Sequence, residues 1–124
     1  MYVQVATVKS ARELKDQSFA LYVFCANTYN WHPDWAVSNF IRNQTGLKDK
    51  SVVAITVGSG STAAAQKALE KLIGNKGGQL LDSRSLWLLK PNDESRPEES
   101  NVKVSVSMAY AWGEQTAKRI ISPD

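Results

Sequence analysis

Two short stretches of the chain contain the residue types that could bind a ligand. They are residues 27–32, NTYNWH, and residues 58–61, GSGS. Glycine-rich loops can present backbone N–H groups to an anion or to carbonyl oxygens, and tyrosine or tryptophan rings can stack on a flat ring. The candidate binding residues are therefore Asn27, Thr28, Tyr29, Asn30, Trp31, His32, Gly58, Ser59, Gly60 and Ser61.

Local chemistry leaves two interpretations of the aromatic residues Tyr29 and Trp31 open. Their rings could stack on a bound aromatic ring, or they could only fill a gap between the loop and the next helix. The same residue types suit both roles, so the choice depends on where the two rings lie in the fold.

Each candidate loop follows a predicted strand and precedes a predicted helix. Residues 19–26, FALYVFCA, and residues 51–57, SVVAITV, are continuous apolar runs, which are typical of strands covered on both faces. Residues 63–73 carry apolar side chains at helical spacing, and Gly74 supplies a stop for this helix. This pattern predicts a parallel sheet, in which ligands bind beyond the carboxyl ends of the strands.

The remaining segments complete an α/β arrangement. Residues 2–8 are predicted to be a strand, residues 79–89 one interrupted strand or two short strands, and residues 91–100 a loop. Residues 102–120 fit either a long helix, which we favour, or a strand followed by a helix. The predicted order is β-α-β-α-β-α-β-α, an α/β sandwich with a small parallel sheet in a single domain over residues 1–124.

Composition narrows the classes of function. The chain has 124 residues, a formal charge of +3 spread along its length, and one cysteine, Cys25. Scattered charge argues against a nucleic-acid interface, and the lack of an apolar run near 18 residues argues against a membrane span. Without a secretory signal or a disulfide, we expect a cytoplasmic protein in which Cys25 is a buried small hydrophobic residue.

The sequence contains no motif that indicates a catalytic residue or a metal site. His32 is the single histidine, and no cysteine or acidic cluster accompanies it at metal-ligand spacing. No G-x-S-x-G nucleophile motif occurs. We therefore expect binding residues rather than a catalytic acid, base or nucleophile.

Residues 58–63 also allow a nicotinamide dinucleotide interpretation. From Gly58 to Ala63 the sequence GSGSTA fits G-x-G-x-x-A after a strand, and Asp82 lies near the spacing of a ribose-binding acid. Against this interpretation, the motif normally follows the first strand of a nucleotide-binding half, and here two predicted strands precede it.

Three successive segments resemble the later two-thirds of a flavodoxin-like protein. They are FALYVFCANTYNWHPDWAVSNFI, LKDKSVVAITVGSGS and GGQLLDSRSLWLLKPNDESRPEE. The resemblance implies a flavodoxin-like three-layer sandwich in which Thr28 and Tyr29 lie beside FMN and residues 58–61 contact the isoalloxazine ring. It implies FMN-binding electron transfer or an FMN-dependent oxidoreductase, with a redox partner.

The chain departs from this family at its N-terminus. It lacks the family's first strand and its T-G-x-T phosphate loop, so we expect an N-terminally truncated form whose FMN binding is weak or lost. The missing strand is central in the family. Its place could be closed by pairing of residues 2–8 with residues 19–26, by a second chain in a homo-oligomer, or by a permuted unit in residues 102–120. The alternative function is a non-catalytic interaction domain that has lost the cofactor.

Overall fold

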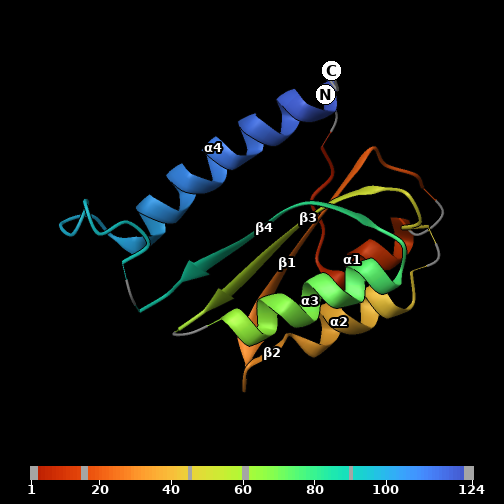
Figure 1. Cartoon of the computed structure of the whole chain (residues 1–124), viewed down its shortest axis with the longest axis horizontal. Helices are drawn as coiled ribbons and strands as arrows, with labels where there is room; N and C mark the ends of the chain where they lie inside the picture. Colours follow the sequence, from red (N-terminus) through yellow and green to blue (C-terminus); the bar gives the residue numbers. More distant parts are fainter. Residues whose placement is uncertain (1–2, 15–16, 45, 60–61, 90, 122–124) are drawn as a thin grey trace.

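A computed structural model describes residues 3–14, 17–44, 46–59, 62–89 and 91–121 of the protein. It has an α/β fold with a four-stranded, mostly parallel sheet and helices on both faces (Figure 1). The strands are β1 (Leu21–Tyr29), β2 (His32–Pro33), β3 (Ser51–Gly58) and β4 (Gln79–Trp87). The helices are α1 (Val8–Ala11), α2 (Trp35–Arg42), α3 (Ala63–Asn75) and α4 (Asn101–Ile121), and a 3-10 turn, Arg12–Leu14, follows α1.

The sheet has the order β2-β1-β3-β4. β1, β3 and β4 are parallel, which confirms the predicted parallel sheet, and β2 is a two-residue antiparallel partner of β1. The helices α2 and α3, which connect the parallel strands, lie together on one face of the sheet, here called the front face (Figure 1).

The hydrophobic core lies between the front face and these two helices. Ile41 of α2 and Leu69 and Ile73 of α3 are fully buried against the sheet residues Phe24 and Val52. The amphipathic pattern of residues 63–73 therefore predicted its buried side correctly. The helix continues to Asn75, and the left-handed residue after it is Gly77 (φ 81°) instead of Gly74.

The opposite, back face of the sheet is covered mainly near β4, by α4. The Arg84 guanidinium lies 5.2 Å from the centre of the Trp112 ring, and Arg119 donates a hydrogen bond to the Leu81 carbonyl at 2.9 Å. On β1 the back face is open to solvent, with 54% of Val23 exposed. The apolar run 19–26 therefore forms a strand only from Leu21 onward, and this strand is covered on its front face alone, which corrects the prediction of cover on both faces.

Cys25 also lies on the open part of the back face. The residue is exposed, which corrects the expectation of a buried small side chain. Partial desolvation by the neighbouring sheet still raises the pKa of its thiol, so the neutral form is favoured.

Residues 3–7 form no strand, which overturns the prediction for residues 2–8 and the proposed pairing with residues 19–26. Instead, the Thr7 hydroxyl accepts a hydrogen bond from the backbone N–H of Ser10 at 3.3 Å and caps α1. This local bond favours a helical turn over an extended strand. Met1 and Tyr2 lie outside the described residues.

The C-terminal segment is one helix, α4, so no strand from residues 102–120 fills the sheet. Ser100 caps it, because its hydroxyl accepts a hydrogen bond from the backbone N–H of Lys103 at 3.2 Å.

Residues 79–87 form a single strand with one register shift opposite Val52 and Val53, so the polar DSR sequence does not interrupt it. Among the described helices, none has the length and apolarity needed to cross a membrane.

Candidate ligand-binding site

The ends of β1 and β3 bring the two predicted loops to the same edge of the sheet. Asn27 pairs with Val57 in the parallel ladder, and the strands end one and two residues later, at Gly58 and Tyr29. A Cβ atom on Gly58 would lie 3.3 Å from the Cβ and Oγ1 atoms of Thr28. Thr28 and Gly58 are therefore in direct contact.

The first loop is a tight β-hairpin. Tyr29 pairs with His32, and the two residues between them, Asn30 and Trp31, have positive φ angles of 48° and 64°. Positive φ at both central residues is the signature of a type I′ turn. Asn30 is a favoured residue for this turn, but tryptophan is not a typical second residue, so the sequence predicted a loop without predicting a hairpin.

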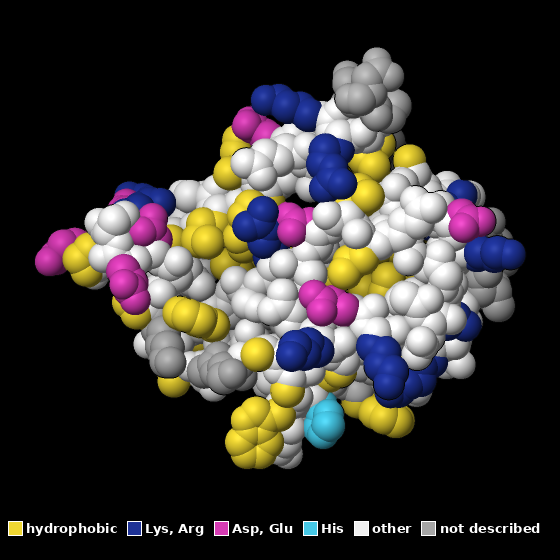
Figure 2. Space-filling view, viewed as in Figure 1, with side chains coloured by type: hydrophobic (Ala, Val, Ile, Leu, Met, Phe, Trp, Pro, Cys, Tyr) yellow, Lys and Arg dark blue, Asp and Glu magenta, His cyan; other side chains and the backbone are white. Residues whose placement is uncertain are grey.

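The hairpin holds its aromatic residues in solvent. The exposed fractions are 60% for Tyr29 and 70% for Trp31. In Figure 2 the histidine lies at the lower end of the molecule, beside exposed hydrophobic side chains. The interpretation that the two rings fill a gap in the packing is therefore wrong.

Two contacts fix the hairpin to the body of the protein. The backbone N–H of Asp34 donates to the Asn27 carbonyl at 2.7 Å. The Asp34 carboxylate accepts a hydrogen bond from the backbone N–H of Ala36 at 2.8 Å and caps α2. These two hydrogen bonds restrict the backbone between the end of β1 and the start of α2.

The Thr28 hydroxyl is the unsatisfied polar group of this edge. Its Oγ1 atom is buried and has no hydrogen-bond partner among the residues that the structure describes. Buried hydroxyls in proteins almost always have a partner, so such a group calls for an explanation. Ser59 is exposed, whereas Gly60 and Ser61, also predicted for the site, lie outside the described residues.

A third loop, after β4, reaches the same edge and was not predicted as part of the site. The backbone N–H of Leu88 donates to the Gly58 carbonyl at 2.8 Å. The Asn92 side chain bonds both backbone groups of Trp87, at 2.6 Å and 3.0 Å, and also donates to Ser105 of α4 at 3.1 Å. The available signal was an asparagine five residues after a strand end, which alone indicates only a turn.

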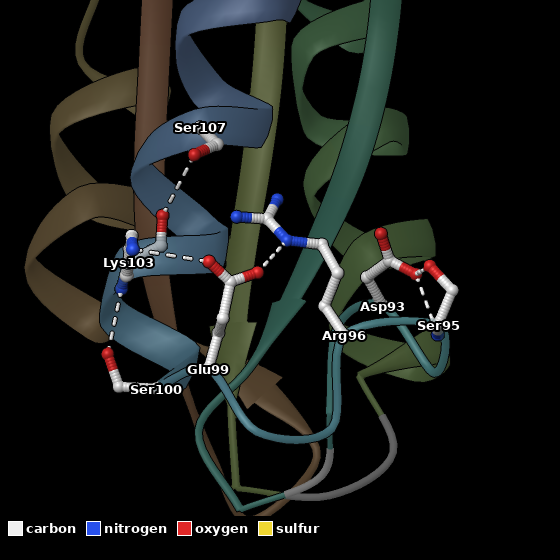
Figure 3. A network of polar contacts seen from close by, with 7 residues as sticks. All are labelled: Asp93, Ser95, Arg96, Glu99, Ser100, Lys103 and Ser107. Atoms are coloured by element: carbon white, nitrogen blue, oxygen red, sulfur yellow. Dashed lines mark hydrogen bonds and ion pairs between the residues drawn. The ribbon is translucent and has the colours of Figure 1, made fainter.

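This third loop is tied to α4 by a charged network (Figure 3). Arg96 pairs with Glu99, and the Lys103 ammonium lies 3.2 Å from the same carboxylate. Hydrogen bonds from Arg96 and Lys103 lower the pKa of Glu99 from 4.5 to about 2. The network fixes the loop after β4 against the first turns of α4.

We expect acid to weaken this network. Because the folded-state pKa of Glu99 lies below its ordinary value, its contribution to stability is complete above about pH 4.5 and is lost as the pH falls toward 2. Glu99→Gln should therefore lower stability near neutral pH, and its difference from the wild type should shrink in acid. Urea unfolding across this pH range measures the difference in stability between Glu99→Gln and the wild type, with Glu98→Gln as the exposed control. A difference that stays constant with pH would contradict the prediction.

The position of Asp82 argues against the dinucleotide interpretation. Asp82 pairs with Val53 near the start of β4, whereas Gly58 pairs with Trp87 at its end. Five residues of strand separate the two positions, a distance of about 16 Å. The Asp82 carboxylate also contacts Arg84 at 2.8 Å. Asp82 is therefore not at the edge where a ribose would be held.

Within the described part of the chain, no three histidine, cysteine or acidic side chains gather to hold a metal ion. Comparison with models of known protein families and with curated proteins gives no match for the chain. The assignment of a function therefore depends on the residues at the carboxyl ends of β1, β3 and β4.

Proposed function

We propose that the protein binds the flat ring of a flavin at the β1–β2 hairpin and acts in cytoplasmic electron transfer or flavin-dependent reduction with a redox partner. The observation that supports this most directly is Trp31, whose ring is exposed while its backbone is held at positive φ. For a bulky residue that conformation costs of the order of 1–3 kcal/mol. Strained residues of this kind cluster at ligand-binding sites.

The residues present suit the ring of the cofactor better than its phosphate. The exposed Tyr29 and Trp31 rings can stack on it. The sequence has no T-G-x-T loop for the phosphate. A bound flavin would supply the redox chemistry, and the chain would bind and orient the ring.

Trp31→Gly separates the stability of the hairpin from its binding. Asn30 followed by glycine is a preferred type I′ turn, so we expect the variant to be more stable by about 1 kcal/mol. Loss of one stacked ring, about 0.5–1.5 kcal/mol, should weaken flavin binding by about 2- to 12-fold. Thermal unfolding and titration by flavin fluorescence measure the two effects.

Tyr110→Ala is the matched control, because Tyr110 is as exposed as Trp31 but lies on α4. We expect it to leave flavin affinity unchanged. If Trp31→Gly and Tyr110→Ala bind flavin as well as the wild type does, the hairpin is not the binding site.

A second candidate function is a non-catalytic interaction domain without a cofactor. It is favoured by the apolar side chains Val102, Val106 and Tyr110, which α4 exposes on the face turned away from the sheet. The same titration separates the two functions, since an interaction domain of this kind would show no saturable change in flavin fluorescence.

A further inference from the structure

The two outer edges of the sheet differ in how they are protected. Next to β4 the ladder contains a register shift, and the strand carries the charged pair Asp82 and Arg84. Arg119 also donates a hydrogen bond to the Leu81 carbonyl on this strand. Charges, irregular pairing and covering side chains are the usual devices that stop a sheet edge from pairing with another chain.

The edge of β1 that faces away from β3 is less protected, because among the described residues no register shift interrupts the ladder beside it. β2 pairs only with Thr28 and Tyr29, so no described strand pairs with residues 21–27 on this side. These residues, LYVFCAN, include no charge and no proline. We call this side of residues 21–25 the open edge.

The backbone pattern shows which residues form the open edge. The Asn27 carbonyl points away from β3, because it accepts a hydrogen bond from the N–H of Asp34. In a strand, the backbone groups of alternate residues point to the same side. Leu21, Val23 and Cys25 therefore direct their N–H and C=O groups outward, and Val23 is the centre of this set.

We propose that the open edge pairs with the same edge of a second copy of the chain, antiparallel, on a two-fold axis at Val23. This register sets Val23 opposite Val23 of the second copy, and Leu21 opposite Cys25 of that copy. All outward backbone groups of the open edge are then paired, and the hairpin stops the ladder beyond residue 27. In a two-fold antiparallel pair, the backbone N–H and C=O groups of one edge bond to those of the other, because each copy offers the same donors and acceptors.

The side chains favour a second copy over a charged partner. Val23 and Cys25 are exposed on the back face beside this edge, and the facing strands would bring no like charges together. Joining the two edges would continue the sheet across both copies and set the apolar side chains of Leu21, Val23 and Cys25 of each chain side by side on one face.

Light scattering after size exclusion at high micromolar concentration tests the proposal. We expect the wild type to be a dimer, and Val23→Lys to weaken the dimer by at least about tenfold, because two lysines would face each other at the axis. Val106→Lys is the matched control, since Val106 is an exposed valine on α4. Circular dichroism establishes that both variants are folded.

A cross-link tests the register. In a Cys25→Ser background, Val23→Cys should form an intermolecular disulfide with oxidised glutathione, because directly opposed Cα atoms lie about 5.5 Å apart, within disulfide range. Val106→Cys in the same background should not. A monomeric wild type would overturn the proposal. A dimer that survives Val23→Lys would also overturn it, and so would one lost with Val106→Lys, which would indicate the exposed face of α4 instead.

Discussion

Leu69→Ala is expected to lower the free energy of unfolding by about 2–5 kcal/mol. Leu69 is fully buried where α3 packs on the front face, in contact with the same core as Ile41 and Val52. Truncation removes apolar burial and leaves a cavity between a helix and a sheet that are both held by other contacts, so the site cannot collapse fully. Urea unfolding followed by circular dichroism gives the difference.

Leu89→Ala is the matched control for this prediction. Its side chain is 80% exposed in the loop after β4, so its removal should change stability by less than about 0.5 kcal/mol. Equal effects of the two substitutions would mean that α3 does not pack on the sheet as described.

Gly58→Ala is expected to destabilise the protein by about 1–3 kcal/mol, because there is no room for the added methyl group. The new Cβ would lie 2.6 Å from the Cγ2 atom of Thr62, which is buried, and 3.3 Å from Thr28. Relief of this clash must move Thr62 or Thr28. We therefore expect flavin affinity to fall together with stability.

Gly46→Ala is the control for the glycine substitution. No atom lies within 4 Å of a Cβ placed on Gly46, so this change should be neutral or stabilising by up to about 1 kcal/mol. Thermal unfolding and the flavin titration are measured on both variants. If Gly58→Ala behaves like Gly46→Ala in both measurements, the close contact between the ends of β1 and β3 affects neither stability nor flavin binding.

The central part of the fold could be predicted because its signals are local. The apolar run of β3, the turn at Gly58 and the amphipathic residues of α3 follow each other in the sequence and point to one parallel unit. The first and last segments were harder, because residues 2–8 are apolar and rich in β-branched side chains, and residues 102–108 alternate like a strand. The hydroxyls of Thr7 and Ser100 decide these cases, because each caps the first turn of a helix.

The candidate site was predictable in part. Parallel strands place their carboxyl ends together, so the meeting of Thr28 and Gly58 follows from two apolar runs and the turns after them. The type I′ hairpin, the exposed rings and the unpartnered Thr28 hydroxyl were not predictable, because they depend on backbone angles and burial. The contribution of the loop after β4 depends on the long-range bond from Leu88 to Gly58, for which the sequence has no local signal.

The most direct test of the proposed flavin site is to titrate the wild-type protein with riboflavin and with FMN under the same conditions. We expect saturable but weak binding of both, with dissociation constants within a few-fold of each other, because stacking on Tyr29 and Trp31 recognises the ring alone. Nanomolar affinity for FMN with a strong preference over riboflavin would contradict it, since that result requires a phosphate site. Absence of saturable binding of either flavin would equally contradict it.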